Sequence, residues 1–155
     1  MTTEATLLTI IKDGRILLLR KAPGRFGEGK WNGVGGKTRP GETPEDCARR
    51  ETLEETGLIV RSLTPHGTLR HYFGQTEEPD WTVHHFSASE YEGEPKESEE
   101  GELRWFPLDR IPYDQMWQDD IHWLPLQIEG RRFQGRVYFN SDGSKMLRHT
   151  IDVEG

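Results

Sequence analysis

The segment at residues 36–58, GKTRPGETPEDCARRETLEETGL, constrains the fold more than any other part of the sequence. It predicts a helix over residues 44–56, because Thr43 is a natural N-cap and Pro44 suits the first helical position. Gly57 follows the last helical residue and predicts a left-handed C-terminal cap. A glycine-rich loop, APGRFGEGKWNGVGGK, leads into the segment. Both ends of this helix are therefore predicted by local signals alone.

Apolar runs before and after the helix predict strands. Residues 7–11 and 16–19 flank an Asp-Gly pair, a favoured two-residue turn, and predict a β-hairpin. Four more strand-like segments and a closing hairpin follow, at residues 58–63, 68–73, 81–87 and 102–107, and at residues 136–140 with 146–153. His84 and His85 fall within the third of these segments, and we expect them on a strand surface.

Residues 118–130 predict a second helix, which begins near Asp119 or Asp120 and ends at Gly130. Pro125 lies inside this helix and is expected to end or kink it. Strands interleaved with two helices predict an α/β domain with a mixed sheet.

Length and composition limit the class of protein. A chain of 155 residues is the usual size of one domain, so we expect a single domain over residues 1–155. Its formal net charge is −7 and its Lys and Arg residues are scattered, which argues against binding of long nucleic acid. No apolar run approaches the roughly 18 residues that span a bilayer, no signal peptide is visible, and Cys47 is the single cysteine. We therefore expect a cytoplasmic monomer with no membrane contact.

Six of the 23 residues in the helical segment are carboxylates, and three of them crowd together. Glu51 and Glu55 are four residues apart, and Glu51 and Glu54 are three apart, so each pair repels by roughly 0.2–0.5 kcal/mol in an exposed helix. All three lie toward the helix C-terminus, where the macrodipole disfavours negative charge. A solvated face that includes Arg49 and Arg50 would explain them. Oxygen ligands in one small volume would also suit a hard cation such as Mg²⁺, or Mn²⁺ in its place.

The same segment resembles the signature of the Nudix hydrolases, G-x5-E-x7-R-E-U-x-E-E-x-G-U, in which U is a bulky apolar residue. It matches at Gly36, Glu42, Arg50, Glu51, Glu54, Glu55, Gly57 and Leu58. Thr52 departs from the signature, because the family prefers an apolar residue there, and we expect a small effect on stability. The resemblance implies a Nudix fold, an α/β/α sandwich with a mixed sheet. It also implies Mg²⁺-dependent hydrolysis of a nucleoside diphosphate linked to another group.

The resemblance further implies which residues are catalytic. Glu51 and Glu55 would bind the metal ion, and Glu54 would be a further ligand or the general base. The carbonyl of Gly36 could complete the coordination shell of the metal. Arg50 would position the glutamates rather than act on the substrate.

A second acidic run, EGEPKESEEGE, lies outside this helix. A solvated loop accounts for most of it. Glu100 resembles a loop glutamate that acts as metal ligand or base in several members of the family, and Glu99 and Glu102 compete for that role.

Three further blocks resemble the mammalian-type oxidised-purine nucleoside triphosphatases, the 8-oxo-dGTP diphosphatases, a branch of this family. They are FGEGKWNGVGGK, PKESEEGELRWFPLDRIP and MWQDD. This resemblance implies substrate-binding residues at Thr6, Lys21, Phe26, Asn32, Gly35, Trp117, Asp119 and Asp120. It is poorest around His71, where that branch lines its base pocket with an aromatic residue. The implied reaction converts oxidised or otherwise modified purine nucleoside triphosphates, the 8-oxo-dGTP and 2-hydroxy-dATP class, to monophosphate and pyrophosphate. Such a reaction limits DNA damage by sanitising the nucleotide pool.

These residue types also suit a purine pocket on physical grounds. The amide of Asn32 can donate to and accept from a base edge, and Trp117 or Phe26 offers a stacking face. Adjacent carboxylates at Asp119 and Asp120 resist simultaneous ionisation, so one can stay protonated and donate a hydrogen bond. Packing would equally explain the aromatic residues, a turn would explain Asn32, and a helix cap would explain Asp119.

The sequence leaves three functions open. The first is the pyrophosphohydrolase of modified purine nucleotides. The second keeps the chemistry and changes the substrate to methylated or undamaged nucleotides, dinucleoside polyphosphates or capped RNA. The third is a non-catalytic nucleotide sensor, for which a missing glutamate in the signature would be typical. Every glutamate of the signature is present.

Overall fold

Strand-forming segments join into one nine-stranded sheet within residues 2–154, the residues that the computed structural model describes. The strands are β1 (Thr3–Lys12), β2 (Arg15–Lys21), β3 (Trp31–Asn32), β4 (Val34–Lys37), β5 (Thr64–Phe73), β6 (Trp81–Ala88), β7 (Gly101–Pro107), β8 (Arg132–Phe139) and β9 (Met146–Glu154). Their order is β3-β2-β1-β6-β5-β8-β9, with β4 paired to β1 and β7 paired to β2. β1 runs parallel to β6, and β5 runs parallel to β8, whereas the other pairs are antiparallel. The sheet is therefore mixed, as predicted.

β1 and β2 form the predicted hairpin. Asp13 and Gly14 connect the paired residues Lys12 and Arg15, and both have positive φ angles, 53° and 76°. A two-residue turn of this kind matches the right-handed twist of the flanking strands. The turn therefore sets the register between the two strands.

The first helix, α1 (Pro44–Thr56), begins and ends where the sequence predicts. The Thr43 hydroxyl accepts a hydrogen bond from the backbone N–H of Asp46 at 3.1 Å. Gly57 closes the helix with a φ of 77°, and its N–H donates to the Leu53 carbonyl at 2.9 Å. Both ends of the helix are thus capped, which fixes the positions of the glutamates along it.

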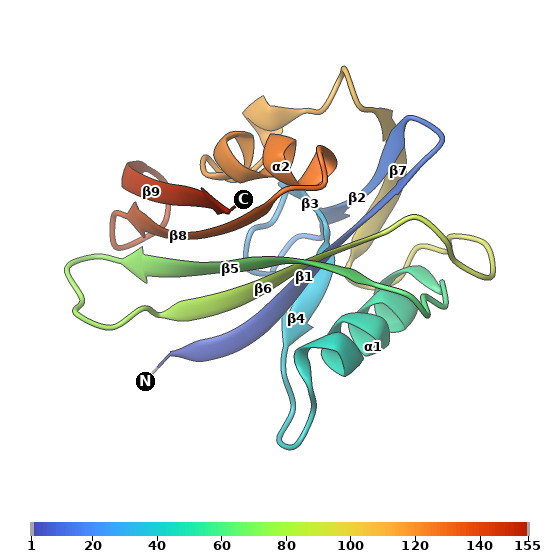
Figure 1. The fold of residues 1–155 in the computed structure, drawn as a ribbon, viewed down its shortest axis with the longest axis horizontal. Coiled ribbons are helices and arrows are strands. Elements are labelled where there is room, and N and C mark those ends of the chain that lie inside the picture. Colours follow the sequence, from blue (N-terminus) through green and yellow to red (C-terminus); the bar gives the residue numbers. More distant parts are fainter. Residues whose placement is uncertain (1, 155) are drawn as a thin grey trace.

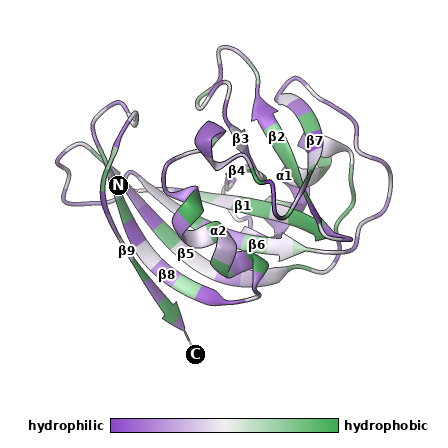
Figure 2. Ribbon diagram, turned by 90° about the horizontal axis from the view of Figure 1, so that it is seen from above, coloured by the Kyte–Doolittle hydropathy of each residue, from purple (hydrophilic) through white to green (hydrophobic). Residues whose placement is uncertain are grey.

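The helices α1 and α2 (Asp120–Ile128) lie on opposite faces of the sheet (Figure 1). The core under α1 includes Leu8, Ala48, Leu58, Val60 and Phe86. The core under α2 includes Leu18, Leu69, Trp123, Leu124 and Phe133. β1 lies between both helices and is largely hydrophobic, whereas β8 near the sheet edge shows alternating bands (Figure 2). The predicted α/β/α sandwich is confirmed.

The strand predicted at residues 58–63 is wrong. Only Ile59 pairs there, with Glu92, through two backbone hydrogen bonds of 3.0 and 2.9 Å. Leu58 and Val60 are buried and Ile59 is exposed, so the apolar alternation is real. Leu58 and Val60 anchor an extended segment in the core under α1, and this segment does not pair along its length with another strand.

The second helix continues through Pro125 to Ile128, so of the two predicted effects of this proline an end of the helix is wrong, and a kink stays a prediction. Ile121, whose carbonyl would otherwise accept from residue 125, is half exposed, and water can replace the missing donor. A short 3-10 helix (Tyr113–Gln115) precedes α2. Within the described part of the chain, no helix is long and apolar enough to cross a membrane.

Candidate active site

A cavity of about 370 Å³ is lined by β1, β4, β6, the glycine-rich loop and the start of α2. Of the residues selected from the sequence, those lining it are Thr6, Lys21, Phe26, Asn32, Gly35, Gly36, Glu51, Glu100, Trp117, Asp119 and Asp120. Glu55 lies beside it on α1, where its carboxylate is within 3.9 Å of the Lys21 ammonium group. A single cavity therefore joins the acidic face of α1 to the aromatic and acidic residues before α2.

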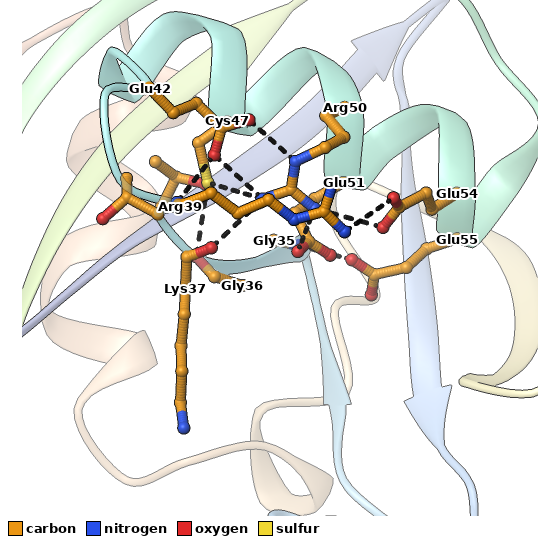
Figure 3. A network of polar contacts seen from close by, with 12 residues as sticks. Gly35, Gly36, Lys37, Arg39, Glu42, Cys47, Arg50, Glu51, Glu54 and Glu55 are labelled. Atoms are coloured by element: carbon orange, nitrogen blue, oxygen red, sulfur yellow. Dashed lines mark hydrogen bonds and ion pairs between the residues drawn. The ribbon is translucent and has the colours of Figure 1, made fainter.

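Glu55 is the most buried carboxylate of the α1 cluster. Its side chain is only 2% exposed, and its Oε2 accepts a hydrogen bond from the backbone N–H of Gly35 at 3.1 Å (Figure 3). Its Oε1 has no hydrogen-bond partner among residues 2–154. Burial raises the pKa of Glu55 well above its usual range, the charge of Lys21 opposes this shift, and Glu51 and Glu100 add to it. The site thus contains a buried carboxyl group whose protonated form is favoured in the metal-free protein.

Arg50 connects the carboxylates of this region (Figure 3). Its guanidinium donates to Glu42 at 2.7 and 2.9 Å, to Glu51 at 2.9 Å and to Glu54 at 3.2 Å. A fifth hydrogen bond joins its Nη2 to the Lys37 carbonyl at 3.1 Å. Arg50 therefore holds the glutamates in place, in agreement with the positioning role that the sequence suggested.

Glu54 faces the arginines rather than the cavity. Besides Arg50, its carboxylate lies 3.5 Å from Arg39, and its side chain is 48% exposed. In the described residues no three His, Cys, Asp or Glu side chains are grouped as a metal site. The role of Glu54 as ligand or base therefore stays a prediction.

Glu100 is the one glutamate of the second acidic run that lines the cavity. Its carboxylate is 3.4 Å from Lys21 and 2.9 Å from Arg25. Glu99 has a side chain that is 97% exposed, and Glu102 pairs with Arg20 on the outside of β2. Of the three alternatives, the geometry therefore favours Glu100.

Gly35 and Gly36 allow β4 to pass close to its neighbours. A Cβ at Gly36 would lie 2.6 Å from Glu51 Oε1, and a Cβ at Gly35 would overlap the Thr6 carbonyl oxygen. The Cys47 thiol donates to the Gly36 carbonyl at 3.6 Å and lies 3.3 Å from the Thr6 hydroxyl. The Thr6 side chain therefore contacts α1 as well as the cavity.

Aromatic rings form the outer end of the cavity. Phe26 is 62% exposed and stacks on Trp117, with ring centroids 5.2 Å apart. Phe26 also stacks on Trp81, with ring centroids 6.1 Å apart and an angle of 18° between the ring planes. Sequence reasoning missed Trp81 as a site residue, although the two-residue period of a strand could have placed it on the same face as Val83, which also lines the cavity.

Two buried carboxylates also line the cavity. Asp119 and Asp120 are each 3% exposed, and Asp119 Oδ2 accepts a hydrogen bond from Trp123 Nε1 at 2.9 Å. Asp119 makes no side-chain cap to α2, so the capping interpretation is wrong. Burial and the neighbouring Asp119 raise the pKa of Asp120 well above its usual range. Asp120 Oδ2 has no hydrogen-bond partner within residues 2–154.

The contacts of Asn32 agree in part with each of its two interpretations, a turn residue and a base contact. Its Oδ1 accepts from the backbone N–H of Gly33 at 2.9 Å, which is a turn contact. Its side chain also lines the cavity, so the amide NH₂ group is the part of Asn32 available to a ligand.

The model of the Nudix domain matches residues 1–127, the larger part of the chain. The chain belongs to the Nudix family of hydrolases. Among curated relatives, the oxidized purine nucleoside triphosphate hydrolase of Danio rerio is 49% identical, over 95% of this chain and 92% of the relative. The protein of the same name from Mus musculus is 46% identical, over 94% and 92%. A mutator MutT protein from Bacillus halodurans has a similar structure, with a TM-score of 0.84, 27% identity and 97% of each chain covered.

Nudix hydrolases generally use divalent metal ions. The expected resemblance to oxidised-purine nucleoside triphosphatases is confirmed by the two curated relatives.

Thr52, the departure from the Nudix signature, is fully buried and its hydroxyl donates to the Ala48 carbonyl at 2.7 Å. The helix therefore satisfies this hydroxyl internally, which agrees with a small effect on stability.

Proposed function

We propose that this protein converts oxidised or otherwise modified purine nucleoside triphosphates, the 8-oxo-dGTP and 2-hydroxy-dATP class, to monophosphate and pyrophosphate. The observation that most supports this is the single cavity that is lined both by Glu51 and Lys21 and by Trp117, Asp119 and Asp120. A nucleotide combines two matching parts, an anionic phosphate chain and a flat polar base. The names of the curated relatives support the same substrate class.

The α1 end of the cavity supplies oxygen atoms of the kind that divalent metal ions prefer, which would have to draw together around the ion because residues 2–154 contain no preformed metal site. Glu51, Glu54, Glu55, Glu100 and the Gly36 carbonyl would hold Mg²⁺, with Mn²⁺ as a substitute, because these ions prefer oxygen ligands. The Oε1 of buried Glu55 supports this assignment, because it accepts no hydrogen bond within residues 2–154 and its ion pair with Lys21 is long, at 3.9 Å. When bound, the metal would neutralise charge on the polyphosphate and activate water as the nucleophile.

The protein groups around the metal would do the remaining work. Lys21, which lies 3.4 Å from Glu100, would turn toward the phosphates once the carboxylates hold cations. Arg50 would keep Glu51 oriented through their 2.9 Å contact. A carboxylate, either Glu54 or Glu100, would take the proton from the attacking water.

At the other end, the base would stack on Trp117 and Phe26 and contact the Asn32 amide. Asp119 and Asp120 would face its Watson–Crick edge. Because the pKa of Asp120 is raised, one carboxyl group of the pair would stay protonated and donate a hydrogen bond. A shift of one proton would then let the pair accept a guanine-like or an adenine-like edge.

Location and assembly belong to the same proposal. We propose a cytoplasmic monomer that sanitises the nucleotide pool, and its net charge of −7 argues against long nucleic acid as a partner.

A nucleotide panel tests this function. Pyrophosphate release is measured with Mg²⁺ for 8-oxo-dGTP, 2-hydroxy-dATP, O6-methyl-dGTP, dGTP, dATP, ADP-ribose and diadenosine tetraphosphate. We expect a preference for the modified purines, and complete loss of activity in excess EDTA with recovery on adding Mg²⁺. Activity confined to ADP-ribose or the dinucleotide would refute the proposed base pocket, and release without a divalent ion would refute the metal.

A further inference from the structure

His85 is a buried histidine whose polar atoms no described residue uses. It lies in β6 and is 2% exposed. Neither Nδ1 nor Nε2 has a hydrogen-bond partner among residues 2–154. Its neighbours are apolar rings, with Trp123 at 4.3 Å edge-on and Phe133 at 5.7 Å. The expected position of His85 on a strand surface is therefore wrong.

The strand register explains why His85 turns inward. Its cross-strand partners are Leu7 in β1 and Gly67 in β5. The glycine adds no side chain beside the imidazole on this face. The neighbouring His84 faces the other side of the sheet, where its Nε2 lies 2.9 Å from Glu4 and its Nδ1 lies 3.4 Å from Thr68.

His85 also lines the nucleotide cavity. Trp123 connects His85 to Asp119 and Asp120, the carboxylates proposed to recognise the base. Its indole ring contacts His85, and its N–H donates a hydrogen bond to Asp119 at 2.9 Å. Asp120 lines the same cavity, and its Oδ2 is also buried without a hydrogen-bond partner within residues 2–154. Two polar groups without partners thus occur in one pocket, His85 in the sheet and Asp120 at the start of α2.

An unpaired buried polar group costs roughly 1–3 kcal/mol, so a native protein normally pairs it with protein, water or ligand. The pKa of His85 is lowered well below its usual range, first by burial and then by His71 and the other nearby histidines. The imidazole is therefore neutral and presents one donor and one acceptor. A purine base is a ligand of matching chemistry, because its edges carry both donors and acceptors.

We propose that His85 is a substrate-binding residue that hydrogen-bonds the purine base at the inner end of the cavity. The inference rests on the proposed function for the identity of the base. A pocket built to pair a polar group rejects ligands that leave that group unpaired, so His85 adds to the selectivity of Asp119 and Asp120. The metal-binding end of the cavity is not involved.

The test uses 8-oxo-dGMP, the product of the proposed reaction, without metal. Binding is followed by quenching of tryptophan fluorescence, since Trp81, Trp117 and Trp123 all line the cavity. His85→Val removes both ring nitrogens, and His85→Asn restores a donor and an acceptor. His84→Val is the matched control, on the same strand but facing away from the cavity.

We expect His85→Val to weaken binding about tenfold or more, His85→Asn to recover most of it, and His84→Val to stay within twofold of the unmodified protein. We also expect the Tm of ligand-free His85→Val to rise by about 2–4 °C, because a buried unpaired group is removed. Inorganic pyrophosphate, which has no base, should bind His85→Val and the unmodified protein equally.

Binding of 8-oxo-dGMP by His85→Val within twofold of the unmodified protein would overturn the proposal, and so would equal weakening for pyrophosphate. His85→Ala replaces His85→Val if the latter is unfolded. If the unmodified protein binds dGMP but not 8-oxo-dGMP, the proposed function fails, and the same variants then test His85 with dGMP.

Discussion

The guanidinium of Arg50 binds the carboxylate of Glu42 through two hydrogen bonds, Nε to Oε2 at 2.7 Å and Nη2 to Oε1 at 2.9 Å. Glu42 lies in the loop before α1, so this pair ties the loop to the middle of the helix. The Nη1 atom of the same arginine donates to Glu51 at 2.9 Å. Glu51 is therefore oriented by a cation that is itself fixed at two points.

Arg50→Lys should reduce kcat/KM by about 10–100-fold, the usual effect of losing a residue that orients metal ligands. A lysine ammonium cannot bind Glu42 in the paired geometry and contact Glu51 at once. Pyrophosphate release from 8-oxo-dGTP measures the change. Arg49→Lys is the control, because the side-chain hydrogen bonds of Arg49 within residues 2–154 go to Asp46 and the Arg61 carbonyl. Equal activity of the two variants would contradict the orienting role.

Glu42 should contribute to stability in acid. Its hydrogen bonds with Arg50 and the Arg39 amide lower its pKa to about 2, below the value of roughly 4.3 in an unfolded chain. A lowered folded-state pKa gives stability that is present above the unfolded value and is lost as pH falls toward 2. The difference in Tm between the protein and Glu42→Gln should therefore shrink from pH 5 to pH 2. A constant difference across that range would contradict the pairing.

Glu55→Gln should lower pyrophosphate release by about 10²–10⁴-fold while leaving the fold intact. The amide keeps the shape of the side chain and can still accept from the Gly35 N–H, but it is a poor metal ligand. Because burial raises the pKa of Glu55, a neutral replacement should also leave Tm unchanged or higher. Glu45→Gln, in the exposed first turn of α1, is the control. Near-normal turnover by Glu55→Gln would refute the assignment.

Asp120→Asn should stabilise the ligand-free protein, increasingly so as pH rises. The pKa of Asp120 is raised in the folded state, so the stability it contributes is present below the unfolded value near 3.9 and is lost as pH rises through the raised value. Thermal unfolding from pH 4 to pH 8 measures the gap between variant and parent. The same substitution should change the ratio of activity toward 8-oxo-dGTP and 2-hydroxy-dATP, and an unaltered ratio would refute the shared proton.

Phe26→Ala should raise KM by about tenfold with little change in kcat or Tm. Stacking on a base contributes roughly 1–3 kcal/mol in single-strand binders, and Phe26 is exposed enough to contribute little to folding. Leu147→Ala, a similarly exposed apolar residue outside the cavity lining, is the control. A fall in Tm without a change in KM would show that Phe26 serves packing alone.

Local signals in the sequence predicted much of the fold. Thr43 and Gly57 marked the ends of α1, and the Asp13-Gly14 turn set the first hairpin, because each signal acts through backbone geometry within a few residues. The strand predicted at residues 58–63 was wrong, because alternating apolar residues also occur in an extended segment that makes a single β-bridge. Pairing partners lie far away in sequence, and local pattern does not encode them.

The site residues, like the elements of the fold, were predicted where the signal is local and missed where it depends on strand pairing. The glutamates of α1 were found because their spacing on one helix is visible in the sequence. Trp81 and His85 were missed as site residues, because their inward direction depends on how β6 pairs with β1 and β5. Glu100 was chosen from the sequence with Glu99 and Glu102 as competitors, and its contact with Lys21 now favours it over both.

The two walls of the cavity come from separate parts of the chain, α1 with β4 on one side and the residues before α2 on the other. In the proposed binding mode, a substitution near Trp117 or Asp119 would alter which base fits without touching the carboxylates of α1. In evolutionary terms, bond cleavage and substrate choice would then be inherited as separable traits. A lineage can therefore acquire a new nucleotide by point mutations in one short loop while selection preserves the hydrolytic machinery.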